Sequence, residues 1–265
     1  MSRQAKKTAI VTGASSGIGY AVCQKLLEKE YLVYGFSRRG TAPAGVIGMC
    51  VDISDENAVF AAVEKVVSEA GRIDLLVNCA GMGISGPVEF AAPEDIRRIT
   101  DVNFIGQVFC TQAVLKTMRA QRSGRIVFVS SVAASIAIPY QAFYSSAKAS
   151  VNALALALRN ELKEFNIKVC TVMPGDASTG FTDARRKDSA HDGIYVHNGS
   201  ATAAMEKDER SGMSPQPVAN AIVRAAEKRD PAPLYTVGGK YKLFMALFKI
   251  LPAGLSYKIV GKMYS

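Results

Sequence analysis

Short apolar runs alternate along the chain with longer segments of helical periodicity. The apolar runs, rich in β-branched residues, span 8–12, 31–37, 46–51, 74–78, 124–130, 167–173 and 234–237. The segments between them carry apolar residues at i, i+3, i+4 and i+7, over 17–30, 55–70, about 94–122, 143–165 and 214–229. Runs that are almost continuously apolar are typical of parallel strands covered by helices on both faces. Because crossovers between parallel strands are right-handed, the pattern predicts an α/β fold with one doubly wound sheet of about seven strands.

One long polar segment, 176–212, interrupts this alternation and contains helical spacing around 201–210. Connections of this length inside a compact domain are usually lids or binding loops. Its larger apolar residues either line a substrate pocket or pack the segment against the domain, and they are Phe181, Ile194, Tyr195, Val196, Met205 and Met213. We therefore expect one domain over 1–238, with a substrate loop at 176–212, and an extension of the same domain at 239–265.

The C-terminal extension has the pattern of a basic amphipathic helix. Its apolar residues recur at helical spacing, at Tyr241, Phe244, Met245, Phe248 and Leu251, while Lys242 and Lys249 share another face. A helix of this kind can make peripheral contact with an anionic membrane surface through 240–265. It can equally cover the substrate pocket or pack in an oligomer, and the sequence leaves all three open.

The composition is that of a globular protein. Hydrophobic residues make up 49% of the 265 residues, and no apolar run approaches the roughly 20 residues that a bilayer-spanning helix needs. The first apolar run is also too short for a signal peptide. The five cysteines are scattered without a Cys-x-x-Cys pair, which disfavours disulfides and a metal site. We expect a cytoplasmic protein, with a peripheral position on a membrane as the alternative.

The net charge of +9 is divided among three regions, 1–40, 101–150 and 239–265. Nucleic-acid binding would require Lys and Arg gathered with stacking aromatics on one element. We therefore expect no nucleic-acid partner.

A glycine-rich loop, TGASSGIG at 12–19, joins the first apolar run directly to a helical segment. Glycines permit a tight turn and close approach of the backbone to a phosphate, and a helix N-terminus supplies free N–H groups. A second glycine pattern, at 81–86, matches G-x-G-x-x-G, but Pro87 and Val88 follow where a helix should begin. We interpret 12–19 as a dinucleotide site of a Rossmann-like fold, and 81–86 as a flexible loop that faces the ligand.

Further polar residues fall at the carboxyl ends of the predicted strands, the edge where open α/β sheets bind ligands. In chain order these are Asn78-x-Ala80-Gly81, Asn103, Ser131, Tyr144 with Lys148 one helical turn later, and Pro174-Gly175. Together with the loop at 12–19, this set resembles the short-chain dehydrogenase/reductase family, over about 8–237. The resemblance implies a nicotinamide-dependent oxidoreductase.

The resemblance also implies a role for each catalytic residue. Tyr144 would exchange a proton with the substrate oxygen while the nicotinamide exchanges hydride with the carbon. Lys148 would lower the pKa of Tyr144 and hold the nicotinamide ribose. Ser131 would hydrogen-bond the substrate oxygen, and Asn103 would hold a water in a proton path through Lys148.

The end of the second apolar run favours NADP(H) over NAD(H). An acidic residue there would bind the ribose 2′-hydroxyl of NAD, but the chain has Ser37, Arg38 and Arg39, and guanidinium groups suit a 2′-phosphate. The full set of expected cofactor contacts is Gly13, Ser15, Ser16, Gly17, Ile18, Gly19, Ser37, Arg38, Arg39, Asp52, Ile53, Asn78, Ala80, Gly81, Tyr144, Lys148, Pro174, Gly175, Ala177 and Thr179.

The sequence thus predicts an NADP(H)-dependent enzyme that reduces a ketone or oxidises a secondary alcohol on a lipophilic substrate, such as a hydroxysteroid. The expected substrate contacts are Ser131, Tyr144, Met82 and Phe181. Reduction of a 3-oxoacyl thioester is the alternative within the same chemistry. A non-catalytic NADP(H) sensor and a membrane-surface scaffold are alternatives of other classes. The family resemblance implies a homodimer or homotetramer formed through 102–122 and 143–165.

Overall fold

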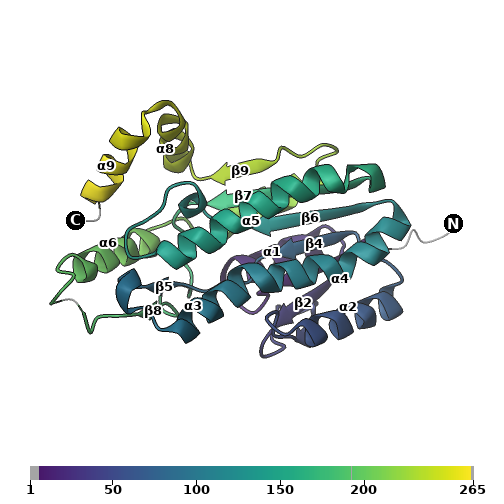
Figure 1. The fold of residues 1–265 in the computed structure, drawn as a ribbon. Helices are drawn as coiled ribbons and strands as arrows, with labels where there is room; N and C mark the ends of the chain where they lie inside the picture. Colours follow the sequence, from purple (N-terminus) through teal and green to yellow (C-terminus); the bar gives the residue numbers. More distant parts are fainter. Residues whose placement is uncertain (1–5, 192, 264–265) are drawn as a thin grey trace.

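The computed structural model describes residues 6–191 and 193–263, and it contains a seven-stranded parallel sheet (Figure 1). The sheet order is β3-β2-β1-β4-β6-β7-β9. The strands are β1 (Thr8–Thr12), β2 (Leu32–Ser37), β3 (Ile47–Cys50), β4 (Leu75–Asn78), β6 (Gly124–Val129), β7 (Ile167–Pro174) and β9 (Leu234–Val237). The chain moves outward from β1 to β3, then returns to β4 on the other side of β1, so the order reverses between β1 and β4. This confirms the predicted doubly wound sheet.

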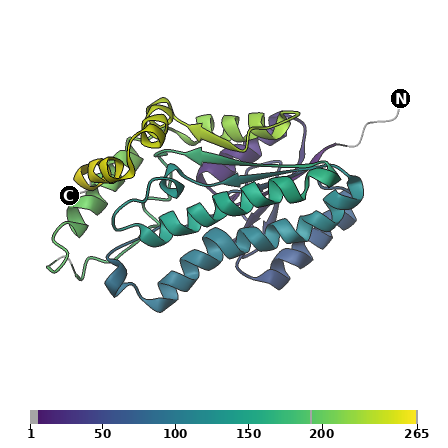
Figure 2. The ribbon, with the colours of Figure 1, turned by 45° about the horizontal axis from the view of Figure 1, so that its top comes forward.

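Helices cover both faces of the sheet (Figures 1 and 2). One face carries α1 (Gly17–Glu28) and α7 (Pro215–Glu227), and the other carries α2 (Glu56–Ala70), α4 (Gly106–Gln121) and α5 (Ala142–Glu161). Side chains of a strand alternate between the two faces. The two layers therefore explain why the strands read as continuously apolar.

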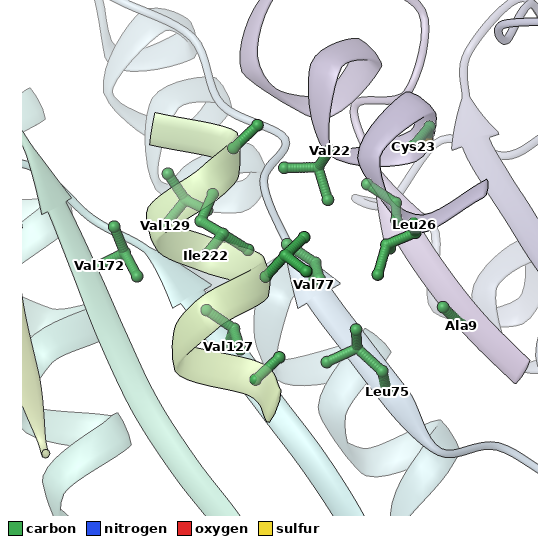
Figure 3. Packing of buried hydrophobic residues seen from close by; sticks show 14 of the residues in the cluster. Ala9, Val22, Cys23, Leu26, Leu75, Val77, Val127, Val129, Val172 and Ile222 are labelled. Atoms are coloured by element: carbon green, nitrogen blue, oxygen red, sulfur yellow. The ribbon is translucent and has the colours of Figure 1, made fainter. Parts of the chain in front are cut away.

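Strand β6 shows this alternation directly. Val127 and Val129 pack with Ile222 of α7 in one buried cluster (Figure 3), whereas Ile126 and Phe128 belong to the cluster on the other face. These four side chains of β6 are each at most 4% exposed. The carboxyl ends of the strands are thereby held rigidly, which fixes the edge where the candidate site lies.

The predicted helix at 94–122 is divided into two. Helix α3 (Pro93–Thr100) leads into one π-helical turn (Asp101–Ile105) before α4 begins at Gly106. A π-helical turn carries an i→i+5 bond and rotates the following residues around the axis, and such turns are frequent at functional sites. Asn103 lies within this turn and is fully buried.

The segment 81–86 is not the free flexible loop that we expected. Strand β5 (Ile84–Ser85) pairs in parallel with β8 (Arg186–Lys187) of the 176–212 segment. A 3₁₀ turn (Val88–Phe90) follows, so no dinucleotide-binding helix begins here. Two residues of strand are too few to leave a periodic signal in the sequence.

The remaining elements are short turns and the C-terminal helices. Two further 3₁₀ turns are Val132–Ala134 and Lys163–Phe165, and α6 (Asn198–Arg210) matches the helix expected near 201–210. The tail forms α8 (Gly239–Ile250) and α9 (Ala253–Met263) instead of one helix. Pro252 accounts for the break, because proline lacks an N–H and disfavours helical backbone in the preceding residue. None of the helices in the described ranges is long and apolar enough to cross a bilayer.

Candidate active site

The glycine-rich loop after β1 lies tightly against the loop after β4. The Thr12 hydroxyl accepts hydrogen bonds from the backbone N–H groups of Cys79 and Ala80, at 2.9 and 3.0 Å. A Cβ on Gly13 would lie 3.0 Å from the Ala80 Cα, and one on Gly19 would lie 2.3 Å from the Gly13 oxygen. Any side chain at Gly19 would therefore displace the loop.

The N-terminus of α1 is open toward this loop. Its capping residue, Ser16, makes no side-chain capping hydrogen bond, so the first N–H groups of the helix remain available. Gly17 adopts a φ of +55°, and a Cβ there would lie 3.3 Å from the Thr179 Cβ. The loop, the helix end and Thr179 thus form a close-fitting cradle that suits a pyrophosphate.

Charged residues surround a hollow of about 400 Å³ beyond the end of β2. Arg38 and Asp52, two of the residues that we expect to contact the cofactor, line it, whereas Arg39 does not. Arg97 and Arg98, from α3, line the same hollow and were not predicted. Three guanidinium groups, from the end of β2 and from α3, therefore line this hollow together with the carboxylates of Asp52, Glu94 and Asp101.

The ionisation of Asp52 reflects these neighbours. Burial acts to raise its pKa, but two hydrogen bonds from Ser54 and the charges of Arg38 and Arg98 outweigh it. The net result is a pKa below the usual value, so Asp52 is a carboxylate at neutral pH.

Ser131, Tyr144 and Lys148 converge at the carboxyl ends of β6 and the start of α5. Tyr144 is half-buried and hydrogen-bonds to the Ser131 hydroxyl. The Lys148 ammonium donates to the Val129 carbonyl at 2.9 Å and lies 5.8 Å from the centre of the Tyr144 ring. The neighbouring Ser130 is turned away and donates to the backbone of α5. Of these two serines, Ser131 is thus the one whose hydroxyl lies beside Tyr144.

We expected Lys148 to lower the pKa of Tyr144, whereas the net shift of that pKa in the protein chain alone is upward. Burial raises the pKa of Tyr144 to about 12, a hydrogen bond with Ser131 acts against it, and Glu209 and Asp176 raise it further. Lys148 is itself buried, and burial lowers its pKa to about 8. A lysine with a pKa of about 8 is still mostly charged at pH 7, but its positive potential is lost as the pH rises through 8.

Lys148 should therefore cost the protein stability. A pKa lowered from 10.5 to about 8 corresponds to about 3 kcal/mol of unfolding free energy. We expect Lys148→Met to be about 2–3 kcal/mol more stable than the unaltered protein below pH 8. The advantage should shrink between pH 8 and 10.5, where the unaltered lysine becomes neutral in both states.

Urea unfolding of both proteins across this pH range measures that difference, and taking the difference cancels the titration of other groups. A Lys148→Met variant that is less stable at pH 7, or whose advantage does not change with pH, would contradict the assignment.

Asn103 holds the loop after β4 by a reciprocal pair of hydrogen bonds. Its side-chain oxygen accepts from the Met82 N–H at 2.7 Å, and its side-chain nitrogen donates to the Met82 carbonyl at 2.8 Å. A Cβ on Gly81 would lie 3.3 Å from the same oxygen and 3.5 Å from the Lys148 nitrogen. The side chain of Asn103 thus positions the loop after β4.

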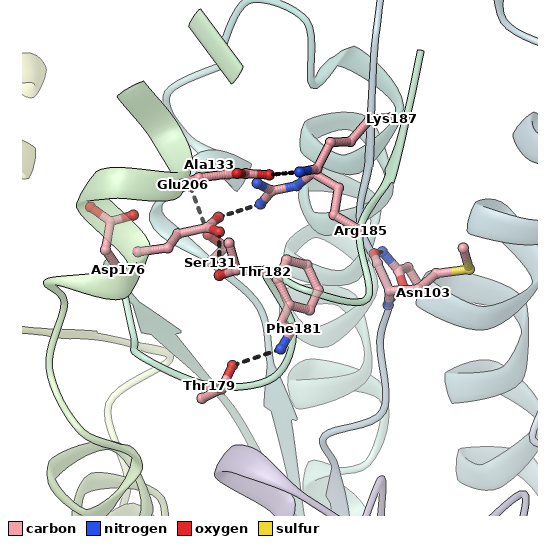
Figure 4. Close-up of polar contacts among 12 residues, drawn as sticks. Asn103, Ser131, Ala133, Asp176, Thr179, Phe181, Thr182, Arg185, Lys187 and Glu206 are labelled. Atoms are coloured by element: carbon pink, nitrogen blue, oxygen red, sulfur yellow. Dashed lines mark hydrogen bonds and ion pairs between the residues drawn. The ribbon is translucent and has the colours of Figure 1, made fainter. Parts of the chain in front are cut away.

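A buried polar cluster that the sequence did not predict borders the substrate side (Figure 4). Glu209 of α6 accepts hydrogen bonds from Thr182, at 2.7 Å, and from the buried Arg185. The Arg185 guanidinium also lies over the Phe181 ring, whose centre is 5.6 Å from that of Tyr144. The cluster therefore fixes Phe181 against Tyr144.

Two of the expected cofactor contacts, Ser37 and Asn78, have hydrogen-bond partners within the protein, and two apolar residues of the 176–212 segment are exposed. The Ser37 hydroxyl donates to Thr41, and the side-chain nitrogen of Asn78 donates to Thr111 inside the α4 layer. Ile194 and Val196 are 68% and 70% exposed, so they neither line a pocket nor pack the segment down.

The C-terminal tail reaches the edge of the site. The Tyr241 ring covers the backbone of Gly175, where a Cβ would lie 2.0 Å from a ring carbon, and the Tyr241 hydroxyl donates to Asp176. Pro174 and Gly175 are thus walled by the tail, which gives the substrate side of the site a boundary from outside the main domain.

No group of three or more His, Cys, Asp or Glu side chains in the described part of the chain is arranged to hold a metal ion.

Comparison with known proteins assigns the chain to a family. Residues 7–190 match the family model described as short chain dehydrogenase. The chain belongs to the short-chain dehydrogenase/reductase family. It is therefore a nicotinamide-dependent oxidoreductase that acts on CH–OH groups and their carbonyl counterparts.

Two curated relatives cover almost the whole chain. The 3-ketodihydrosphingosine reductase of Bacteroides thetaiotaomicron is 38% identical over 244 residues, which cover 91% of each chain. The NADPH-dependent 3-dehydrocapnine reductase of Ornithobacterium rhinotracheale is 30% identical over 274 residues, which cover 96% of each.

Solved structures agree in fold. A short-chain dehydrogenase from Streptomyces avermitilis superposes with a TM-score of 0.83 over 99% of both chains, at 25% identity. ElxO with NADP bound superposes with a TM-score of 0.73 over 89% of this chain and 99% of its own, also at 25% identity.

Proposed function

We propose that the protein reduces a long-chain ketone to a secondary alcohol with NADPH, and that the ketone carries an amine on the neighbouring carbon, as 3-ketodihydrosphingosine does. The observation that carries the proposal is the hydrogen-bonded pair Ser131 and Tyr144, with Lys148 beside it, at the carboxyl edge of the sheet. These are the groups needed to bind a carbonyl oxygen and to protonate it.

The division of work follows from the chemistry of each group. The bound cofactor would supply hydride to the carbonyl carbon. Ser131 would donate a hydrogen bond to the carbonyl oxygen, and Tyr144 would deliver its proton to that oxygen. A tyrosine with a pKa of about 12 is fully protonated at neutral pH, which suits the direction of ketone reduction.

A pH dependence follows from this ionisation. Reduction uses the neutral Tyr144 hydroxyl, so we expect kcat/KM for the ketone to be nearly constant from pH 7 to 9. Oxidation needs the phenolate, whose fraction rises about tenfold per pH unit below a pKa of about 12. Initial rates of alcohol oxidation at saturating NADP should therefore rise about tenfold per pH unit over the same range. Oxidation rates that stay flat would contradict the role given to Tyr144.

The preference for NADPH is supported by the hollow beyond β2. Arg38, Arg97 and Arg98 line it together with Asp52, Glu94 and Asp101, and guanidinium groups bind phosphate oxygens through charge-assisted hydrogen bonds. One relative of nearly equal length is described as NADPH-dependent.

The amino-ketone substrate is supported by two carboxylates near the catalytic tyrosine. The charges of Asp176 and Glu209 both act to raise the pKa of Tyr144. Glu209 is paired with Arg185, whereas Asp176 accepts from the neutral Tyr241 hydroxyl. Lys240 is the positive charge that acts on Asp176, and an ammonium group next to the ketone would add a second one, which a hydroxysteroid or a 3-oxoacyl thioester would not.

Substrate comparison tests this proposal. We expect rapid NADPH oxidation with 3-ketodihydrosphingosine and rates at least about tenfold lower with its N-acetyl derivative, a steroid ketone or a 3-oxoacyl thioester. Asp176→Asn should raise KM for the amino ketone by about tenfold or more and leave the N-acetyl ketone within about twofold. A higher rate with the steroid ketone would establish the hydroxysteroid alternative, and NADPH binding without turnover on any ketone would favour a sensor.

A further inference from the structure

The two C-terminal helices are anchored to the substrate side of the molecule by their inner faces. Met245 of α8 and Val260 of α9 are buried in a small cluster with Ile136 and Met173. The rings of Phe248 and Tyr257 meet edge to face, with centres 5.4 Å apart, and join the two helices. Figure 2 shows both helices at the same end of the molecule as α6, beyond the carboxyl ends of the strands. The tail is therefore a fixed part of the wall around the site.

The outer faces of the same helices carry a second set of large apolar side chains that nothing in the described chain covers. On α8, Leu243, Leu247 and Ile250 follow one another at i, i+4 and i+7, and are 64%, 47% and 81% exposed. On α9, Leu255, Ile259 and Met263 repeat every four residues. Large apolar side chains gathered in stripes on a surface mark an interaction site.

Lysines flank both stripes. Lys240, Lys242, Lys249, Lys258 and Lys262 are all exposed, and no Asp or Glu occurs within 239–263. A second copy of the same surface would bring these lysines against one another, and like charges disfavour such a dimer. An anionic bilayer satisfies both features, since its headgroups pair with lysines while apolar side chains enter the acyl boundary.

We propose that α8 and α9 form a docking surface for an anionic lipid bilayer. The apolar stripes would insert at the headgroup boundary, and the lysines would lie among the anionic headgroups. Because Tyr241 of α8 also covers Gly175 and contacts Asp176, docking would place the mouth of the site at the bilayer surface. A lipophilic ketone could then pass from the bilayer to Tyr144 without crossing water.

Flotation of the full-length protein with lipid vesicles tests the apolar part of the surface. We expect binding to vesicles of phosphatidylcholine with phosphatidylglycerol, and binding at least about tenfold weaker to phosphatidylcholine alone. Ile250→Glu and Leu247→Glu should each abolish flotation. Phe60→Glu, at an exposed apolar position of α2 far from the tail, is the matched control and should float like the unaltered protein.

A charge series tests the electrostatic part. Each lysine near an anionic surface raises the affinity for that surface about fivefold. The double variant with Lys249→Gln and Lys258→Gln should therefore bind anionic vesicles about 25-fold more weakly. Lys116→Gln with Arg119→Gln removes the same charge from exposed positions of α4 and should change it by less than about twofold.

The outcomes separate this proposal from the proposed function, because vesicle binding does not depend on which ketone is reduced. Absence of flotation, or equal effects of the tail and control variants, would overturn it. So would a dimer in sedimentation velocity that Ile250→Glu dissociates, since a second copy would then cover the stripes. Turnover of a short water-soluble ketone should be the same in Ile250→Glu as in the unaltered protein, which also shows that the variant folds.

Discussion

Tyr144→Phe is expected to lower kcat for ketone reduction by about a thousandfold while changing NADPH affinity by less than about twofold. The substitution removes one oxygen atom and leaves the ring that contacts Phe181. The proton for the developing alkoxide must then come from water, which is neither positioned nor hydrogen-bonded to Ser131 as the phenol is. General acid catalysis by a positioned side chain contributes about 10²–10⁴ in rate, so the loss should appear in kcat.

Single-turnover rates and fluorescence titration of NADPH separate the two effects. Tyr140→Phe is the matched control, because Tyr140 lies four residues earlier and removing its hydroxyl should change kcat by less than about twofold. A Tyr144→Phe variant with more than a tenth of the normal kcat would show that another group supplies the proton.

Arg38→Asp is expected to lower kcat/KM with NADPH by about a hundredfold and to reverse the preference between NADPH and NADH. The substitution removes a guanidinium from the hollow beyond β2 and places a like charge against the 2′-phosphate. A charge-assisted hydrogen bond contributes about 1.5–3 kcal/mol, and repulsion by the new carboxylate adds to the loss. The rate with NADH should not fall, because its 2′-hydroxyl can donate to a carboxylate.

Arg39→Asp is the control for this change, since Arg39 is exposed and does not line the hollow. Its effect on the ratio of the two kcat/KM values should be less than about fivefold. Equal effects of the two substitutions would show that the 2′-phosphate lies elsewhere, and a wild-type preference for NADH would remove the basis of the NADP(H) proposal.

The layered architecture could be predicted from the sequence because it depends on local periodicity. Strands buried on both faces and helices with one apolar stripe leave a signal within each segment. The π-helical turn at Asp101–Ile105 and the β5–β8 pair left none, since one is a rotation within a helical pattern and the other joins residues about 100 positions apart. The break between α8 and α9 could have been found, because Pro252 is visible in the sequence.

The candidate site divides in the same way. Gly13, Ser131, Tyr144 and Lys148 stand at fixed spacings within single elements or at strand ends, so the motif locates them. Arg98 at the adenosine end is positioned by tertiary contacts between elements distant in sequence, and so is the cluster of Thr182, Arg185 and Glu209. The pKa values of Tyr144 and Lys148 could not be predicted from the sequence either, because burial in the folded structure is the largest cause of both shifts.

Transfer of deuterium tests the central claim most directly. Purified protein is incubated with 3-ketodihydrosphingosine and NADPH that carries deuterium at both hydrogen positions of C4 of the nicotinamide, and the product is analysed by mass spectrometry. We predict one deuterium on the carbon that was the ketone, in one stereoisomer of the alcohol, and none with Tyr144→Phe over the same time. Oxidation of NADPH without deuterium in the alcohol, or no alcohol from this ketone, would contradict reduction of an amino ketone at this site.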